Sequence, residues 1–329
     1  MTPKRDENRE DVPGNFKSGF VALVGRPNVG KSTLLNRVVG ETVAITTNRP
    51  QTTRMRVRGI VNREQSQIVL LDTPGIHLPP GSEAKGGKAA AKTRAINRFM
   101  VSEAEAALSE VDLCIQVIEA HGRGRLPAAE EEDSLVLKVV EGSGCPALLA
   151  VNKTDLLKDK KLILPVLAAY NETGIFKELV PISARTGEGI ESLLTAVESL
   201  LSEGPRYFPP DMITDQPERE LAAEFIRQQV ILQSREEIPF ATAVEVYSFE
   251  DKPDKNLVVI HATLFVERES QKGILIGKKG GKLKSIGSRA RKSIESMLSC
   301  KVFLDLRVKV KSDWSKTAGG LRSVGYDRR

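Results

Sequence analysis

The feature that most constrains this fold is a glycine-rich loop between an apolar strand and a helix. Residues 20–25, FVALVG, have the pattern of a short buried strand, and residues 32–40, STLLNRVVG, have helical spacing that stops at Gly40. The loop between them, GRPNVGKST at 25–33, fits the phosphate-binding pattern G-x-x-x-x-G-K-[ST] in the strand-to-helix context that it requires. This unit predicts a nucleotide-binding α/β sheet.

Each residue type in this loop has a chemical role toward phosphate. The glycines let backbone N–H groups turn toward phosphate oxygens, and Lys31 can reach the β- and γ-phosphates. The Ser32 hydroxyl is expected to bind Mg²⁺, and the helix N-terminus adds its positive end. Nucleotide contacts are therefore expected from Gly25, Arg26, Pro27, Asn28, Val29, Gly30, Lys31, Ser32 and Thr33.

A second motif ends the apolar run QIVLLDTPG at 67–75. Asp72 is expected to bind the Mg²⁺ shell through water, and the Gly75 N–H is expected to meet the γ-phosphate. Phosphoryl transfer to water often uses a glutamine directly after such a motif, but this chain has Ile76 there. We expect nucleotide contacts from Asp72, Thr73, Pro74, Gly75 and Ile76.

Two later strand ends carry the residue types that bind a guanine base. The Asp155 carboxylate can accept hydrogen bonds from guanine N1–H and N2–H₂, a donor pair that adenine lacks. Lys153 is expected to lay its stem over the base, and the Ala184 N–H is offered to guanine O6. The base contacts are predicted at Asn152, Lys153, Thr154, Asp155, Ser183, Ala184 and Arg185.

Residues 41–56, ETVAITTNRPQTTRMR, lie where a switch loop is expected, between the first helix and the Asp72 strand. Thr53 is the predicted Mg²⁺ ligand of this loop, with Thr52 as the alternative. Without a catalytic glutamine, hydrolysis is expected to be slow and to use Mg²⁺, Lys31, Thr53 and the Gly75 backbone. Asn28 either helps hold K⁺ beside the phosphates or only shapes the loop.

The order of elements predicts two domains joined by a linker rich in proline and acidic residues. Strands alternate with helices in the first part, which predicts a doubly wound, mainly parallel α/β sheet with its ligands at the carboxyl ends of the strands. The second part is predicted to be small and α+β. The expected boundaries are a disordered tail over 1–17, the α/β domain over 18–203, the linker over 204–217, the α+β domain over 218–311 and a C-terminal tail over 312–329.

A second glycine loop lies in the α+β part, within the sequence GILIGKKGGKLKSIG. It is too short for another nucleotide phosphate loop, but G-x-x-G is the signature with which KH domains clamp about four nucleotides of RNA. Strands before the loop suggest the type II arrangement, with Ile274, Leu275, Ile276, Leu283 and Ile286 lining an apolar groove for bases. RNA contacts are predicted at Ile274, Ile276, Gly277, Lys278, Lys279, Gly280, Lys282, Lys284, Arg289 and Arg291.

Charge and composition agree with a polyanionic partner in the cytoplasm. The net charge is +6, and between Lys272 and Lys311 the only acids are Glu295 and Asp305. The three cysteines form no C-x-x-C pair, and the three histidines form no metal-ligand cluster. The polar N-terminus lacks the apolar core of a secretory signal, and no apolar run approaches the length of a membrane span.

A small GTPase domain followed by a KH domain resembles the bacterial Era GTPase family. The resemblance runs from about Phe20 to the C-terminal LRSVGYD and rests on GRPNVGKST, QTTR, DTPGIH, RAINRFM, AVNKTD, VPISARTG, YFPPDMITDQPER, ERESQKGILIGKKGGKLKSIGSRARKSIE and KVFLDLRVKVKSDW. It implies a monomeric factor that hydrolyses GTP to GDP, binds the single-stranded 3′ end of 16S ribosomal RNA and assists assembly of the 30S subunit. It also implies loose association with the inner membrane, and the family lacks the catalytic glutamine too.

One segment departs from the family pattern. Residues 78–93, LPPGSEAKGGKAAAKT, are longer than expected after the Asp-x-x-Gly motif. They form either a mobile basic switch loop or a species-specific contact to RNA or protein. Two other classes of function are alternatives, an RNA-modifying enzyme driven by GTP and a membrane or cell-cycle signalling switch. The chain has no catalytic cysteine or cofactor fingerprint for the first, and no anchor or lipidation motif for the second.

Overall fold

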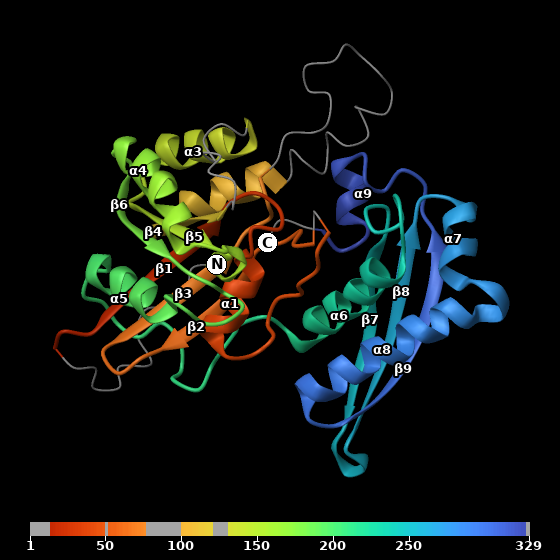
Figure 1. Ribbon diagram of the computed structural model, residues 1–329. Coiled ribbons are helices and arrows are strands. Elements are labelled where there is room, and N and C mark those ends of the chain that lie inside the picture. Colours follow the sequence, from red (N-terminus) through yellow and green to blue (C-terminus); the bar gives the residue numbers. More distant parts are fainter. Residues whose placement is uncertain (1–13, 50–51, 77–99, 121–130, 327–329) are drawn as a thin grey trace. The chain divides into compact units, whose positions relative to one another are not determined.

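The structure is a computed structural model that describes residues 14–49, 52–76, 100–120 and 131–326, and these form two compact units (Figure 1). The first unit contains residues 14–43, 53–76, 100–120 and 131–215. The second contains residues 44–49, Thr52 and 216–326, so part of the predicted switch loop belongs to the second unit. The segment 78–93 lies outside the described residues.

The first unit is built on a sheet whose described strands run in the order β2-β3-β1-β4-β5-β6. β2 pairs with β3 in antiparallel fashion and the other neighbours are parallel, as expected for a doubly wound sheet. The edge strand β2 was not predicted from the sequence. The bounds are β1 (Lys17–Val24), β2 (Val57–Asn62), β3 (Ser66–Asp72), β4 (Leu113–Glu119), β5 (Ala147–Asn152) and β6 (Phe176–Pro181).

Helices cover both faces of this sheet. α1 (Lys31–Val39) and α5 (Ile190–Leu200) lie on one side in Figure 1, and α3 (Glu131–Ser143) and α4 (Leu164–Glu172) lie on the other. Short 3₁₀ turns precede α4, at η2 (Thr154–Leu156) and η3 (Lys160–Ile163). The side chains of the inner strands β1, β3, β4 and β5 are almost all buried between these layers. Ligand-binding loops are therefore expected at the carboxyl ends of the strands.

The second unit has the predicted α+β order. It begins with α6 (Glu218–Gln233), β7 (Ala243–Lys252), the turn η4 (Pro253–Lys255) and β8 (Leu257–Val266). It continues with α7 (Glu269–Ile276), η5 (Lys278–Gly280), α8 (Gly281–Leu298), β9 (Lys301–Val310) and the short α9 (Ala318–Arg322). β7 and β8 form an antiparallel pair, and β9 joins parallel to β8.

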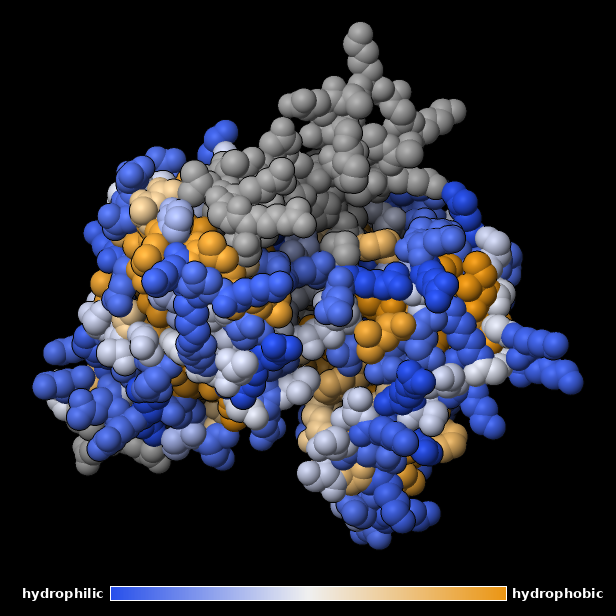
Figure 2. Space-filling view, in the orientation of Figure 1, coloured by the Kyte–Doolittle hydropathy of each residue, from blue (hydrophilic) through white to orange (hydrophobic). Residues whose placement is uncertain are grey.

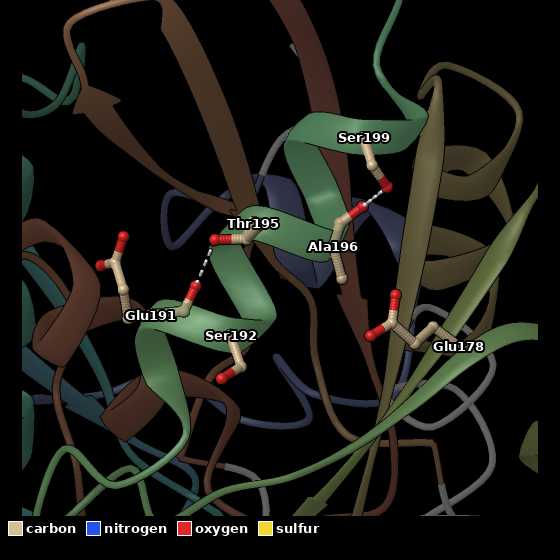
Figure 3. A pocket seen from close by; sticks show the side chains of 6 residues that line it. All are labelled: Glu178, Glu191, Ser192, Thr195, Ala196 and Ser199. Atoms are coloured by element: carbon tan, nitrogen blue, oxygen red, sulfur yellow. Dashed lines mark hydrogen bonds between the residues drawn. The ribbon is translucent and has the colours of Figure 1, made fainter.

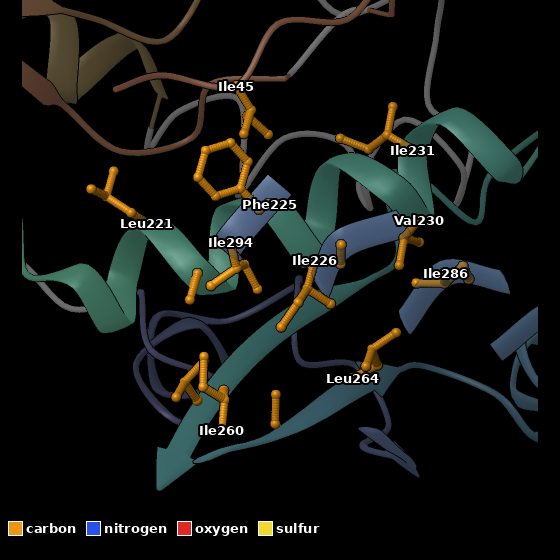
Figure 4. Packing of buried hydrophobic residues seen from close by; sticks show 14 of the residues in the cluster. Ile45, Leu221, Phe225, Ile226, Val230, Ile231, Ile260, Leu264, Ile286 and Ile294 are labelled. Atoms are coloured by element: carbon orange, nitrogen blue, oxygen red, sulfur yellow. The ribbon is translucent and has the colours of Figure 1, made fainter. Parts of the chain in front are cut away.

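The core of the second unit lies between its sheet and the helices α6 and α8 (Figure 4). Alternate residues of β8, such as Ile260 and Leu264, point toward the apolar stripe of α6 and toward Ile286 and Ile294 of α8. The apolar stripe of α6, formed by Leu221, Ala222, Phe225, Ile226 and Val230, is therefore core. Ile45 from the switch loop packs against the same cluster, next to Phe225.

Described residues within both predicted tails are buried. Phe16 is 2% exposed and β1 begins at Lys17, so the last residues of the expected tail over 1–17 belong to the first unit. Trp314 is 1% exposed, donates its Nε1–H to the Ala241 carbonyl at 3.2 Å, and stacks on Tyr326. The predicted C-terminal tail therefore packs into the second unit. No helix among the described residues combines the length and apolar character needed to cross a membrane.

Candidate nucleotide site and nucleic-acid surface

The phosphate loop connects β1 to α1 and holds a buried lysine. Lys31 is 6% exposed, and its ammonium donates hydrogen bonds to the carbonyl oxygens of Gly25 at 2.9 Å and Arg26 at 2.8 Å. Burial lowers the pKa of Lys31 to about 8, against the opposing effect of the Asp72 carboxylate. A phosphate group would replace the weak carbonyl partners with full negative charge.

Three oxygen-bearing side chains converge beside Lys31. Ser32 Oγ donates to Asp72 Oδ2 at 2.5 Å, and Thr53 Oγ1 lies 3.2 Å from Asp72 Oδ2 and 2.9 Å from Ser32 Oγ. The alternative ligand, Thr52, uses its hydroxyl within its own segment, on Thr47 and the Arg49 carbonyl. The structure therefore brings Thr53, and not Thr52, to Ser32 and Asp72.

This oxygen cluster fits Mg²⁺. Asp72 is fully buried, and its Oδ1 has no hydrogen-bond partner among the described residues. Burial raises the pKa of Asp72, while Lys31 and the hydrogen bonds from Ser32 and Thr53 act to lower it. Mg²⁺ prefers hard oxygen ligands and needs few of them from the protein, because it keeps several waters and takes phosphate oxygens. Ser32, Thr53 and Asp72 would hold it.

The Asp-Thr-Pro-Gly turn lies against the phosphate loop. A Cβ atom on Gly75 would lie 2.6 Å from the Pro27 backbone nitrogen, so this close approach requires glycine. The Ile76 N–H donates to the Gly25 carbonyl at 3.1 Å, and the Ile76 side chain is fully buried in the core of the first unit. Ile76 thus contributes packing and a backbone hydrogen bond, but no polar side-chain group.

The base-binding loops are braced through one side chain. Asn152 donates from Nδ2 to the Val29 carbonyl at 2.8 Å and accepts at Oδ1 from the Ala184 N–H at 2.9 Å. The Ala184 N–H, which was expected to face guanine O6, is therefore bonded to Asn152. The sequence could not show this contact, because the three residues are far apart in the chain. Thr154 also faces inward, donating from Oγ1 to the Ile182 carbonyl at 3.0 Å.

Both carboxylate oxygens of Asp155 have partners. The Ser183 hydroxyl donates to Oδ1 at 2.6 Å, and the Arg185 guanidinium lies 2.5 Å from Oδ2. The hydrogen bond from Ser183 lowers the pKa of Asp155, and Arg185 adds to this effect. The Arg185 side chain is 71% exposed, so it can leave. Arg185 therefore occupies an oxygen that guanine N–H groups are expected to use.

Sequence reasoning missed two acidic partners of predicted site residues. Glu119, at the end of β4, holds the Lys153 ammonium at 2.6 Å. Asp133 on α3 is 1% exposed and lies 2.7 Å from Arg26 Nε. The sequence contains a signal for the first, because Glu119 lies near the end of the apolar run VDLCIQVIEA at 111–120. The second had none, since nothing in the α3 sequence marks Asp133 as buried.

A separate depression lies between α5 and β6, with a volume of about 370 Å³ (Figure 3). It contains none of the predicted site residues, and Glu191 at its rim pairs with Arg63. Its lining is Glu178, Glu191, Ser192, Thr195, Ala196 and Ser199. We assign it no role in nucleotide binding.

The second glycine loop forms a tight turn between α7 and α8. Gly277 has φ 71°, and a Cβ atom there would lie 2.7 Å from the Lys282 Cβ, so the turn itself requires glycine. Lys278 and Lys279 are exposed at its tip, and burial lowers the pKa of Lys282. The exposed positively charged side chains of α8 follow at Lys284, Arg289 and Arg291.

Only three of the five residues predicted to line an apolar groove are accessible at the surface. Ile274 is 49% exposed, and Ile276 and Leu283 are half-buried, so these three remain available at the surface. Leu275 and Ile286 are fully buried in the core of the second unit and cannot line a groove. The reason is helical periodicity, which turns these two side chains toward the sheet. Figure 2 shows mainly hydrophilic surface over α8 on the face in view.

The switch segment 44–49 and 52 is held by α6. Arg227 is 1% exposed and donates to the Thr52 carbonyl and, at 2.8 Å, to Glu224. Gln228 Nε2 donates to the Thr46 carbonyl at 3.1 Å. Sequence reasoning missed both residues, because polar groups beside an apolar stripe usually face solvent.

Together, these sites define a P-loop GTPase domain joined to a KH domain. Residues 20–153 match the family model described as 50S ribosome-binding GTPase, and residues 237–315 match the KH domain model. The chain is 49% identical over 311 residues to GTPase Era of Geobacter metallireducens (strain ATCC 53774 / DSM 7210 / GS-15), covering 94% of this chain and 98% of that protein. It therefore belongs to the Era GTPase family and is a GTPase.

Two solved structures are similar over nearly the whole chain. One is Era in complex with MgGDPNP and nucleotides 1506–1542 of 16S ribosomal RNA, with a TM-score of 0.86 and 37% identity. The other is Aquifex aeolicus Era bound to GDP·AlF₄⁻, with a TM-score of 0.85 and 37% identity. Each match covers 95% of this chain and 100% of the other.

Replacement of Arg185 tests its competition with the base. Arg185→Ala should raise the affinity for GDP and GTP severalfold, because guanine no longer displaces a guanidinium from Asp155. Arg185→Lys keeps a cation, so its nucleotide affinity should lie between those of the unmodified protein and Arg185→Ala. Asp155→Asn should lose GTP affinity and gain xanthosine triphosphate binding. Equilibrium titration with fluorescent nucleotides measures all of these, and an unchanged or lower affinity of Arg185→Ala contradicts the competition.

The lowered pKa of Lys31 makes nucleotide binding depend on pH. In the free protein Lys31 loses its proton above about pH 8, whereas bound phosphates favour the charged form. Binding should therefore take up a proton above this pH, and the affinity should fall by up to about tenfold per pH unit. Calorimetry in buffers with different ionisation enthalpies measures the uptake. The affinity should stay constant between pH 6.5 and 7.5, and no proton uptake at pH 8.5 would contradict the assignment.

Proposed function

We propose that this protein is a GTP-controlled RNA-binding factor that binds the single-stranded 3′ end of 16S ribosomal RNA and assists assembly of the 30S subunit. The observation that carries this proposal is the presence of two phosphate-binding loops with different geometries in one chain. The first buries Lys31 against its own carbonyls, as a nucleotide phosphate requires. The second exposes Lys278 and Lys279, which suits a long polyanion. A ribosomal RNA partner is supported by the similar Era complex.

In the first loop, this chain's residues bind and orient the triphosphate. Lys31 and the backbone N–H groups of the loop hold the phosphate oxygens, and the Gly75 N–H faces the γ-phosphate. When bound, Mg²⁺ neutralises phosphate charge and is held by Ser32, Thr53 and Asp72. No polar side chain is available at Ile76 to orient the attacking water, which supports slow intrinsic hydrolysis.

In the second loop, close backbone approach and charge act together. The Gly277–Gly280 turn admits an RNA backbone, and Lys278 and Lys279 neutralise its phosphates. The exposed Ile274 and half-buried Ile276 offer apolar contact to unpaired bases. Lys282, Lys284, Arg289 and Arg291 extend the positive surface along α8.

Nucleotide state and RNA binding are proposed to be coupled through the switch loop. Thr53 contacts Ser32 and Asp72, and it directly follows Thr52 in the chain. Thr52 is bonded to Arg227 of α6. Loss of the γ-phosphate would release Thr53, and the change would pass through Thr52 to its hydrogen bond with Arg227 of α6. The apolar stripe of α6 packs on the sheet of the KH domain.

Four other expectations remain predictions. K⁺ beside Asn28 is tested by comparing hydrolysis rates in Na⁺ and K⁺. Loose association with the inner membrane is tested by vesicle flotation. The expected monomeric state is tested by sedimentation, and the cytoplasmic location expected from the composition is tested by cell fractionation.

Changes in the G-x-x-G loop test RNA binding. Gly277→Asp with Gly280→Asp should block RNA entry by bulk and charge, but Gly277 is also needed for the turn. Lys278→Glu with Lys279→Glu keeps both glycines and is the sharper variant. Both proteins should bind RNA of nucleotides 1506–1542 of 16S ribosomal RNA at least about tenfold more weakly, because phosphate contacts are lost.

The salt dependence of binding provides the control for this experiment. Lys278→Glu with Lys279→Glu should reduce the slope of log affinity against log salt by about two, one for each lost phosphate contact. GTP affinity and melting temperature should match those of the unmodified protein. Unchanged RNA affinity in this variant would remove the G-x-x-G loop from the RNA site.

Replacement of Arg227 tests the proposed coupling. RNA affinity should differ between the protein with GTP analogue and the protein with GDP. Arg227→Ala should reduce that difference severalfold, because the hydrogen bond to Thr52 is lost. Gln228→Ala is a milder variant with the same expected direction, and Arg235→Ala, at an exposed position near the same helix, is the control. Equal RNA affinity in all nucleotide states of the unmodified protein would contradict the switch.

A further inference from the structure

The sheet of the second unit has one face packed on helices and one face with exposed side chains. Strand side chains alternate between the two faces, so Ile260 and Val302 point into the core while their neighbours point away. On the outward face, Phe303 is 54% exposed and Tyr247 is 47% exposed. Two large aromatic rings on one open sheet face are unusual for positions with no packing role.

These rings belong to a cluster that crosses all three strands. The His261 ring on β8 stacks on Tyr247 of β7, with centroids 5.9 Å apart and an interplanar angle of 28°. Phe303 of β9 meets His261 edge-on at 6.2 Å. We call Tyr247, His261 and Phe303 the ring platform.

A β-bulge directs Tyr247 toward this platform. Val246 pairs with Ala262 and Ser248 pairs with His261, so Tyr247 is the extra residue between them. A bulge of this kind re-aims a side chain and is often found near a functional surface. Val246 before the bulge and Phe249 after it both contact the core, so the bulge leaves two residues, Tyr247 and Ser248, between them on the outward side.

The charges around the platform are divided between the two edges of the sheet. On the edge strand β9, Lys301, Arg307 and Lys309 are exposed and share the outward face with Phe303. Asp305 lies among them, but its charge is offset by Arg307, which lies 3.4 Å away, and its Oδ2 also lies 3.3 Å from His261 Nδ1. The opposite edge, β7, has the acidic outward residues Glu245 and Glu250.

We propose that this face is a second RNA-binding surface, on which unpaired bases stack on the ring platform and the phosphate backbone follows β9. Aromatic rings stack on any base, and an adjoining positive edge neutralises phosphates. The acidic β7 edge repels the backbone and so fixes the side on which it lies. Lysine is depleted at protein–protein interfaces, which favours RNA over a second copy of the chain. The inference rests on the proposed function of RNA binding and extends it beyond the G-x-x-G loop.

The first test removes the rings. Tyr247→Ala with Phe303→Ala should bind RNA of nucleotides 1506–1542 of 16S ribosomal RNA about tenfold more weakly or worse, because each base stack contributes that much. Tyr247→Phe keeps the ring and should retain the affinity. Leu232→Ala, at another exposed apolar side chain of this unit, is the matched control and should also retain it. GTP hydrolysis by the free protein should be unchanged in all three.

Comparison with the loop variant separates this inference from the function on which it rests. If Lys278→Glu with Lys279→Glu weakens RNA binding and the ring variant does not, the second surface is wrong and the proposed function stands. If only the ring variant weakens it, the surface is supported and the G-x-x-G assignment fails. If the ring variant instead changes self-association in sedimentation and leaves RNA affinity unchanged, the face is a protein interface and the inference is overturned.

A spectroscopic test reports stacking directly. Trp314 is the only tryptophan of the chain and is buried, so Phe303→Trp adds a single exposed reporter. Addition of the same RNA should quench its fluorescence, with a midpoint equal to the binding constant. Tyr247→Ala in this background should reduce the quenching. Unchanged fluorescence at saturating RNA would overturn the inference.

Discussion

The buried carboxylate of Asp72, beside the buried ammonium of Lys31, is the constraint on which the nucleotide site depends. Burial of either charge alone is costly, so each needs the other or a bound ion nearby. Asp72 ends β3, Ser32 lies in the first turn of α1 and Thr53 lies in the switch loop, yet their oxygens lie within hydrogen-bond distance of one another. One buried carboxylate is thus the point at which a strand, a helix and the predicted switch loop meet.

The switch loop links this charge pair to the second unit by covalent continuity. Its last threonine contacts the Asp72 cluster, and its preceding residues pack and hydrogen-bond with α6 through Ile45, Thr46 and Thr52. Thr52 and Thr53 are adjacent in the chain, so the two sets of contacts are separated by a single peptide bond. Arg227 is buried and donates to the Thr52 carbonyl, so the contact between the switch loop and α6 depends on a hydrogen bond as well as on apolar packing.

Sequence reasoning predicted the fold class and the four nucleotide motifs, because phosphate and base chemistry requires short runs of particular residues at strand ends. It failed where function depends on contacts between distant residues. No local sequence pattern marks three of these contacts: the hydrogen bond between Asn152 and Ala184, the hydrogen bond from Arg227 to Thr52, and the packing of Trp314. The inward turn of Leu275 and Ile286 was missed for a different reason, because an apolar residue beside a binding loop suits a groove and a core equally well.

The positive charge between Lys272 and Lys311 is not a single surface, although the sequence presents it as one run. The lysines and arginines of the G-x-x-G loop and α8 lie on the helical layer of the second unit, whereas Lys301, Arg307 and Lys309 lie on the open face of its sheet. The strand KVFLDLRVKV explains the division: its apolar residues alternate with the charged ones, so the same ten residues build core and surface at once. A period of two in a basic strand therefore predicts a charged sheet face. Phe303 lies at one of the outward positions of that strand, where a solvated face would carry a polar side chain.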